Sequence, residues 1–288
     1  MKVLPFKVPV SEETSFRVQV DRVNHFYDKF HHHQEVQITW IQKSYGSLLM
    51  GNAITTFEEN DLLVIGANVP HSFQNDEFFY KKNKELLAKA TSILFEKNAF
   101  GETFFNLPEM KNIKNFIKKA DKGYRILGET KKEIIAQLKM IEEKNGTERF
   151  LILMEILNRL SISKEVELLS NLSFLGNPTS SESKKLEAVF QYMLDHHQRT
   201  IKLEEVAKVA NLSISAFCRF FKLRTRKTFS QFVNEFRISA ACNKLLLDDF
   251  SISEVCYDVG FTNLSNFNRQ FKKITGYTPS QYIVKHEV

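Results

Sequence analysis

The sequence predicts an α+β protein with two domains, a β-rich N-terminal part and an all-helical C-terminal part. Residues 1–105 hold short runs of β-branched and aromatic residues divided by turn residues, the pattern of a small β-domain. Helical periodicity starts near residue 108, pauses at residues 170–183, a stretch rich in Ser and Asn that we interpret as a linker, and then continues. A chain of 288 residues has room for two such domains.

The predicted strands of the N-terminal part are four runs: Glu35–Ile41, Ser47–Phe57, Asp61–Gly66 and Ala90–Glu96. Many short strands at this spacing are typical of a sandwich or a small barrel. A helical segment, residues 106–169, follows. Its run "TERFLILMEILNRLS" is apolar on nearly every face, so we expect burial against the protein's own sheet or in a dimer seam. We interpret the segment as the dimerisation element of a homodimer.

Most of the excess positive charge lies in the last third of the chain. From Glu182 onwards there are 16 Lys and Arg residues against 11 Asp and Glu, which gives +5 of the total +6. Such a basic region favours nucleic-acid binding, although a solvated basic surface would carry the same charge. The absence of a long apolar run, a signal peptide or a CxxC pair favours a cytoplasmic protein with no membrane partner.

The C-terminal region, residues 184–288, contains an internal repeat with a constant offset of 50 residues. Ser215–Phe232 aligns with Ser265–Tyr282, and Arg219 aligns with Arg269. Two units at one offset, each with a matching arginine, argue against a helical bundle whose exposed faces are merely solvated.

Each copy has the pattern of a helix-turn-helix unit, at about residues 201–225 and 251–275. A short helix ends at a tight turn, and a second helix begins behind Ser213 or Asn263, both good N-cap residues. Phenylalanines at i,i+4 spacing mark the buried face of the second helix, so its opposite, polar face would read a DNA major groove. The expected DNA contacts are Ser215, Cys218, Arg219, Lys222 and Arg224 in the first copy and Ser265, Asn266, Asn268, Arg269, Lys272 and Lys273 in the second.

The stretch between the two units, Ser230–Asp249, predicts one amphipathic helix of about five turns. Such a helix would place the two reading helices about 34 Å apart, in successive major grooves.

Residues Glu187–Lys285 resemble the DNA-binding domain of the AraC family of bacterial transcription regulators. The resemblance rests on "LEEVA", "LSISAFCRFFK", "FRISAACNKLL", "SISEVCYDVGF" and "NFNRQFKKITGYTPSQY". It implies two helix-turn-helix units that activate or repress promoters, with double-stranded promoter DNA as a partner and RNA polymerase as another if the protein is an activator. One departure is Arg226, which stands where many members have the glycine that Gly276 supplies in the second copy.

The stretch "HHHQEV", His31–Val36, raises the question of a metal site. In a strand, side chains alternate, so His31 and His33 would share one face and His32 would play no part in the site. With His71 they form a set that can hold zinc, iron, nickel or manganese. The segment resembles the cupin-type, small-barrel sensor domains at the N-terminus of many AraC-family regulators. Glu35, however, lies closer to the histidines than the glutamate of metal-binding cupins does.

We therefore expect a pocket for a small-molecule effector, without a catalytic residue or a resident cofactor. Its expected lining is His31, His33, Glu35, Trp40, His71 and Phe73. The aromatic residues are compatible with a sugar, or they belong to the core. Two other functions stay open. One is a cupin metalloenzyme fused to a DNA-binding domain, with the metal on the three histidines; the other is a regulator that needs no ligand.

Overall fold

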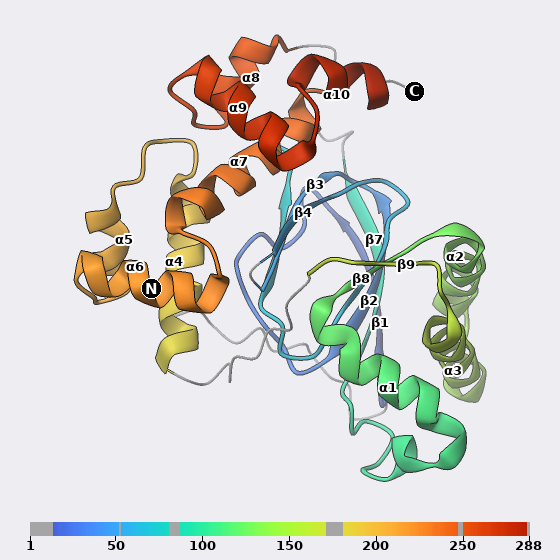
Figure 1. The fold of residues 1–288 in the computed structure, drawn as a ribbon. Coiled ribbons are helices and arrows are strands. Elements are labelled where there is room, and N and C mark those ends of the chain that lie inside the picture. Colours follow the sequence, from blue (N-terminus) through green and yellow to red (C-terminus); the bar gives the residue numbers. More distant parts are fainter. Residues whose placement is uncertain (1–13, 52, 81–86, 171–180, 247–249, 287–288) are drawn as a thin grey trace.

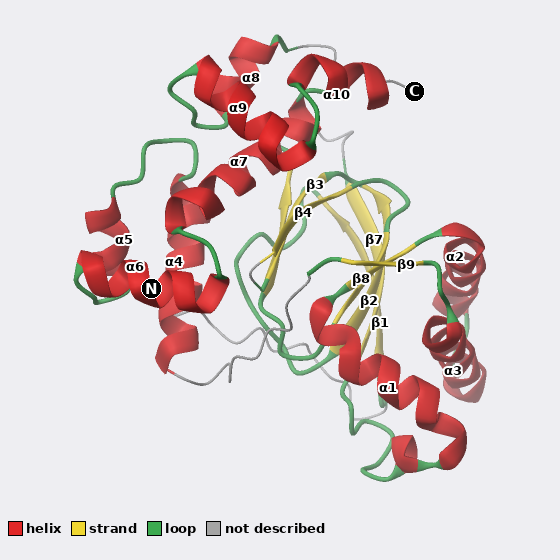
Figure 2. Cartoon of the chain, in the orientation of Figure 1, coloured by secondary structure: helices red, strands yellow, loops and turns green. Residues whose placement is uncertain are grey.

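A computed structural model describes residues 14–51, 53–80, 87–170, 181–246 and 250–286 of the protein (Figure 1). Two β-sheets occupy the N-terminal part, and the C-terminal part consists of helices (Figure 2). The predicted order, a sheet region followed by an all-helical region, is confirmed. No helix in these ranges combines the length and the apolar character that a membrane crossing needs.

The two sheets are antiparallel and differ in size. In spatial order, the larger sheet consists of β1 (Arg17–Val23), β7 (Ala88–Phe95), β2 (Val36–Lys43), β5 (Leu62–Ile65), β8 (Tyr124–Ile126) and β9 (Val166–Leu168). The smaller sheet consists of β4 (Ala53–Phe57), β3 (Gly46–Met50) and β6 (His71–Asn75). The predicted run 47–57 is thus a hairpin of two strands, β3 and β4.

The expected closed barrel is not found, because no pairing among the described strands joins the two sheets into a ring. Strand β5 pairs instead with β8, and β8 continues the larger sheet to β9. Strand β4, the edge of the smaller sheet, packs against helix α7 (Phe229–Lys244). An isolated bridge between His31 and His71 adds one residue pair beside β6.

Strand β2 turns alternate side chains toward two different environments. Its even-numbered residues pack against a layer of helices, and its odd-numbered residues point toward the smaller sheet. The first set is Val36, Ile38 and Trp40, and the second is Gln37, Thr39 and Ile41. This alternation follows from the two-residue period of a strand.

The helical layer on the larger sheet consists of α1 (Lys111–Lys119), α2 (Gly128–Glu143) and α3 (Gly146–Ile162) (Figure 1). The segment predicted to be helical, residues 106–169, thus contains three helices. A fully helical segment 106–169 is wrong, because this segment also supplies β8 and β9. The run that is apolar on nearly every face, now α3, buries Leu153 and Leu157 against the sheet side and leaves Leu151 and Ile162 each 61% exposed.

The helices of the C-terminal part are α4 (Ser181–His196), α5 (Leu203–Val209), α6 (Ile214–Thr225), α7, α8 (Ile252–Asp258), α9 (Leu264–Thr275) and α10 (Pro279–His286). Short 3-10 helices elsewhere in the chain are Glu77–Tyr80, Phe104–Asn106, Pro108–Met110 and Ala120–Lys122. One hydrophobic cluster joins α4, α5 and α6 to the first half of α7, and a second joins the rest of α7 to α8 and α9. Helix α7 therefore connects the two halves (Figure 1).

Two predicted boundaries fall partly outside the described residues. The predicted linker, 170–183, includes residues 171–180, which are not described, and α4 already begins at Ser181. The predicted helix Ser230–Asp249 corresponds to α7, which ends at Lys244, and residues 247–249 are not described either.

Candidate functional site

Helices α6 and α9 begin and end in the same way, although their sequences differ. The predicted N-caps are confirmed, because the side chains of Ser213 and Asn263 each accept a hydrogen bond from the backbone N–H three residues on, at 3.3 and 3.0 Å. At the C-terminal ends, Arg226 and Gly276 both adopt the left-handed conformation, with φ of 60° and 82°. Arg226 thus makes the same exit turn as the glycine, in a conformation that a residue with a Cβ adopts less readily.

The buried face of each of these helices is built from two phenylalanines. Phe217 and Phe221 in α6, and Phe267 and Phe271 in α9, have no exposed surface. Because residues four apart lie on one side of a helix, the polar residues between them point outward. Of the predicted DNA contacts, Asn266 is half-buried, and the exposed ones are Ser215, Cys218, Arg219, Lys222, Arg224, Ser265, Asn268, Arg269, Lys272 and Lys273.

Two of these arginines have partners within the protein. The guanidinium of Arg269 donates a hydrogen bond to Asn266 Oδ1, at 2.9 Å, which orients the arginine along the surface of α9. Arg224 forms an ion pair with Glu182 of α4. Each half of the C-terminal region therefore contains a helix with a buried aromatic side and an exposed polar side that carries arginine and lysine.

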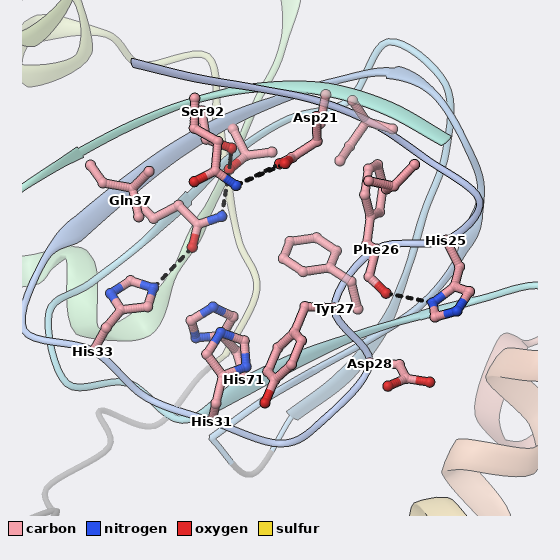
Figure 3. A pocket seen from close by; sticks show the side chains of 17 residues that line it. Asp21, His25, Phe26, Tyr27, Asp28, His31, His33, Gln37, His71 and Ser92 are labelled. Atoms are coloured by element: carbon pink, nitrogen blue, oxygen red, sulfur yellow. Dashed lines mark hydrogen bonds between the residues drawn. The ribbon is translucent and has the colours of Figure 1, made fainter. Parts of the chain in front are cut away.

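The second candidate site is a cavity of about 370 Å³ in the N-terminal part (Figure 3). Strands β1, β2, β6 and β7 and the segment 25–33 supply its walls. The lining residues are Gln19, Asp21, Val23, His25, Phe26, Tyr27, Asp28, His31, His33, Gln37, Thr39, Ile41, His71, Phe73, Ala90, Ser92 and Leu94. The volume suits a small organic ligand.

One wall of the cavity is a row of hydrogen-bonded polar side chains. His33 Nε2 lies 3.1 Å from Gln37 Oε1, and Gln37 Nε2 donates to Thr39 Oγ1 at 2.7 Å. The hydroxyl groups of Thr39 and Ser92 share a further hydrogen bond of 2.8 Å. Polar groups in such a row can exchange partners with the hydroxyl or amide groups of a ligand.

The three histidines His31, His33 and His71 gather at one end of the cavity, and all are buried (Figure 3). Nδ1 of His31 and Nδ1 of His71 each lie 2.8 Å from a backbone carbonyl oxygen two residues before the ring. Burial lowers the pKa of His31 to about 4 and holds the pKa of His71 well below its usual value. At neutral pH both rings are therefore uncharged, and a proton on Nδ1 leaves Nε2 with a lone pair.

These histidines are of the right kind for a metal ion. One ring nitrogen of each lies within 4.8 Å of one ring nitrogen of the others, and anchoring of Nδ1 by a carbonyl oxygen is the usual support of a metal-bound imidazole. Zinc bonds of about 2.0–2.1 Å would require the three nitrogens to move closer together. Glu35 does not complete the set, because its carboxylate lies 3.4 Å from His33 Nδ1 and does not line the cavity. Among the described residues, the three histidines alone would therefore hold the metal.

The structure separates the six residues that we expected in the pocket. His31, His33, His71 and Phe73 line the cavity, whereas Glu35 and Trp40 do not. Trp40 belongs to the core between β2 and the helical layer, where Lys139 Nζ lies 5.4 Å from the ring centroid. For Trp40 the period of a strand gives the reason, since an even-numbered residue of β2 cannot share a face with Gln37 and Thr39.

Several cavity residues were missed from the sequence. Gln37 and Thr39 follow His31 and His33 at the same two-residue period, so the alternation itself could have identified them. Gln19 and Asp21 come from β1, which was not predicted as a strand; the Gln19 amide donates to both carboxylate oxygens of Asp21, at 2.8 and 3.0 Å.

Comparisons with known proteins show the family to which the C-terminal part is similar. Residues 206–284 match a protein family described as a helix-turn-helix domain. An uncharacterised HTH-type transcriptional regulator from the cgkA 5′ region of Pseudoalteromonas carrageenovora is 35% identical over 122 residues, which cover 38% of this chain and 72% of that protein. The chain belongs to the AraC family of helix-turn-helix transcriptional regulators.

Other similarities of this AraC-family chain are more distant. The uncharacterised HTH-type transcriptional regulator YdeC of Bacillus subtilis is 32% identical over 101 residues, 35% of this chain and 35% of that protein. The match therefore spans about a third of that relative's length. ToxT from Vibrio cholerae O395 is similar in structure over 94% of this chain and 97% of that chain, with 15% identity and a TM-score of 0.38.

Proposed function

We propose that this AraC-family protein binds double-stranded promoter DNA through α6 and α9 and regulates transcription in response to a small molecule. The observation that carries the proposal is the repetition of one design, in which each helix buries two phenylalanines and exposes a polar face with an arginine. The short helices α5 and α8 would complete two helix-turn-helix units, with α6 and α9 as the reading helices.

The exposed residues of the two helices would make two kinds of contact, to bases and to phosphates. Arg219 and Arg269 occupy equivalent positions and can each bind a guanine through two hydrogen bonds. The lysines near the C-terminal ends of the helices, Lys222 in α6 and Lys272 and Lys273 in α9, would contact phosphates. Phosphate contacts fix the position of the protein on DNA, and base contacts select the sequence.

The cavity between the N-terminal strands would hold the effector. No lysine or arginine lines it in the described part of the chain, whereas Asp21 and Asp28 contribute carboxylates. An anionic effector would therefore lack an opposite charge, while a neutral ligand rich in hydroxyl groups, such as a sugar, matches the row of polar side chains. The N-terminal sheets would thus act as a sensor of the kind found in cupin-type domains, although they form two separate sheets.

A homodimer fits the outer surface of the helical layer. Met140 of α2 and Leu151 and Ile162 of α3 are between 53% and 61% exposed. Large apolar side chains on neighbouring helices are typical of a protein–protein contact. If the protein activates transcription, RNA polymerase would be a further partner.

Selection from a pool of genomic fragments tests the function. We expect the purified full chain to enrich a small set of fragments that share a sequence motif, because base contacts discriminate by about 1–3 kcal/mol each. The variant Arg22→Ala, which removes an exposed arginine of β1, should enrich the same set and serves as the control. Recovery of fragments in proportion to their abundance, with no common motif, would contradict the proposal.

A further inference from the structure

Residues 30–33, which we call the coupling segment, turn alternate side chains toward two different parts of the protein. His31 and His33 line the cavity. Phe30 and His32 point the other way and contact helix α4 of the C-terminal part. The alternation expected from the sequence therefore holds for His32, but the expectation that His32 has no role is not supported by its surroundings.

Phe30 is inserted into the hydrophobic core of the C-terminal part. The residue is 1% exposed, and its ring stands edge-on to that of Phe190, with the centroids 5.1 Å apart. The backbone N–H of Phe30 donates to Gln191 Oε1 at 2.9 Å. Both contacts lie on α4, so this part of the sensor is docked against a specific helix of the DNA-binding part.

The contact continues from α4 to the first reading helix. The ring of Phe190 stands edge-on to that of Phe221, at 5.9 Å, and stacks on that of Phe232, at 4.9 Å. Phe221 is one of the two phenylalanines that form the buried face of α6. Phe30, Phe190 and Phe221 thus make a continuous row from the wall of the cavity to the helix that is proposed to read DNA.

Next to Phe30, the contact between the coupling segment and α4 leaves buried polar atoms without hydrogen bonds to any described residue. His32 Nε2 lies 3.8 Å from Glu187 Oε1, which is too far for a hydrogen bond, and Glu187 is 3% exposed. Within the described residues, neither Glu187 Oε1 nor His32 Nδ1 has a hydrogen-bond partner. A buried polar atom without a hydrogen-bond partner costs free energy, so these atoms weaken the contact between the coupling segment and α4. A small movement of His31 or His33 in the cavity can therefore change this contact.

Within the described residues, the N-terminal part alone lines the cavity. None of the described residues that line it comes from α4 to α10. Other contacts between the two parts include the 2.9 Å hydrogen bond between Ser47 and Ser239 and the 3.8 Å ion pair between Lys29 and Asp195. Neither Ser47 nor Lys29 is among the described residues that line the cavity. The coupling segment contacts both the cavity and α4.

We propose that the coupling segment transmits occupancy of the cavity to α4 and through it to α6. A ligand that contacts His31 and His33 moves the backbone they share with Phe30 and His32, and this changes the docking of α4. Such a ligand acts as a switch to the extent that it binds one docking state better than the other. This inference rests on the proposed sensor function, because it describes how that sensor would reach the DNA-binding part.

Hydrogen exchange of the α4 amides in the full chain tests the coupling without a known ligand. Phe30→Ala should raise the exchange rate of α4 by at least about tenfold, because it empties a buried contact. His31→Ala should raise it as well, although His31 does not touch α4, because the two side chains share one short segment. Gln34→Ala, which changes an exposed residue next to the segment, is the matched control and should leave α4 unchanged.

Exchange of β7, the strand between β1 and β2, shows whether the sensor sheets stay folded. If His31→Ala also raises exchange in β7, His31→Gln replaces it in the same comparison. Exchange of α4 that is equal in the His31 variant and in Gln34→Ala would overturn the coupling, as would unchanged exchange in Phe30→Ala. Binding of the same proteins to DNA is measured in parallel. If the unmodified chain does not bind DNA specifically, the proposed function is refuted, and the exchange result still decides whether the coupling exists.

Discussion

Gln37 Oε1 lies 3.1 Å from His33 Nε2, and this contact links the histidine cluster of the cavity to the polar row of strand β2. In His31 and His71, by contrast, Nδ1 lies 2.8 Å from a backbone carbonyl oxygen. A metal ion or a ligand that binds the cluster must compete with Gln37 for the ring of His33.

This competition predicts how added zinc behaves. We expect the full chain to bind one Zn²⁺ per molecule, Gln37→Ala to bind it more tightly because His33 is released, and His71→Ala to lose the site. Titration against a chromogenic chelator measures the affinity and the stoichiometry, with Gln34→Ala as the control. Stoichiometric zinc in the His71→Ala variant would show that the three histidines are not the site.

Stability should fall in acid, because His31 and His71 remain neutral in the folded protein. An unfolded histidine titrates near pH 6.5, so below this pH the unfolded state binds more protons and acid favours unfolding. With the pKa of His31 lowered to about 4, the free energy of unfolding should drop by up to about 3 kcal/mol between pH 6.5 and 4 on account of His31 alone. Urea unfolding at several pH values, with a chelator present, measures the drop.

The His31→Gln variant removes one of these titrating groups and should flatten the dependence on pH. Gln34→Ala keeps all the histidines and should follow the unmodified chain. A His31→Gln profile that is as steep as that of the unmodified chain would mean that His31 does not carry the acid sensitivity.

Trp40 should matter for stability and not for the contents of the cavity. The residue is 8% exposed within the core that joins the larger sheet to the helical layer. Trp40→Ala should lower the free energy of unfolding by about 3–5 kcal/mol, the usual range for removal of a buried aromatic side chain, and leave zinc affinity unchanged. A stable Trp40→Ala protein with altered zinc affinity would contradict this placement and indicate that Trp40 belongs to the wall of the cavity.

Lys222 and Lys272 occupy equivalent positions near the ends of α6 and α9, and we expect each to contact a phosphate. Lys222→Ala and Lys272→Ala should each weaken binding to all DNA sequences by a similar factor. The slope of log affinity against log salt concentration should become shallower by about 1 for each lysine removed. A change for one sequence alone, at an unaltered slope, would point to a base contact instead.

The C-terminal part could be predicted closely because its signals are local. The N-caps Ser213 and Asn263, and the phenylalanines four residues apart, each lie within a few residues of the feature they specify. The left-handed turn at Arg226 shows the limit of this approach, since a residue that disfavours the conformation adopts it in a context set by the rest of the fold.

The sheet region was harder to predict because its features depend on residues far apart in the chain. Strands β8 and β9 have three residues each; β8 pairs with β5, and β9 pairs with β8, although these strands lie far apart in the chain. The alternation placed His31 and His33 together and His32 apart, yet only the fold shows that α4 lies on the side of His32. Trp40 was assigned to the pocket for its aromatic character, although the same alternation excludes it.

The most direct test of the central claim, that α6 and α9 both read DNA, is the base preference of two arginine variants on a selected fragment. Arg219→Ala and Arg269→Ala should each weaken binding by about 1–3 kcal/mol and relax the preference at one end of the site, the two ends lying about one helical turn apart. Arg22→Ala should bind with unaltered affinity and preference. If both variants keep the affinity and base preference of the unmodified chain, neither helix reads the sequence.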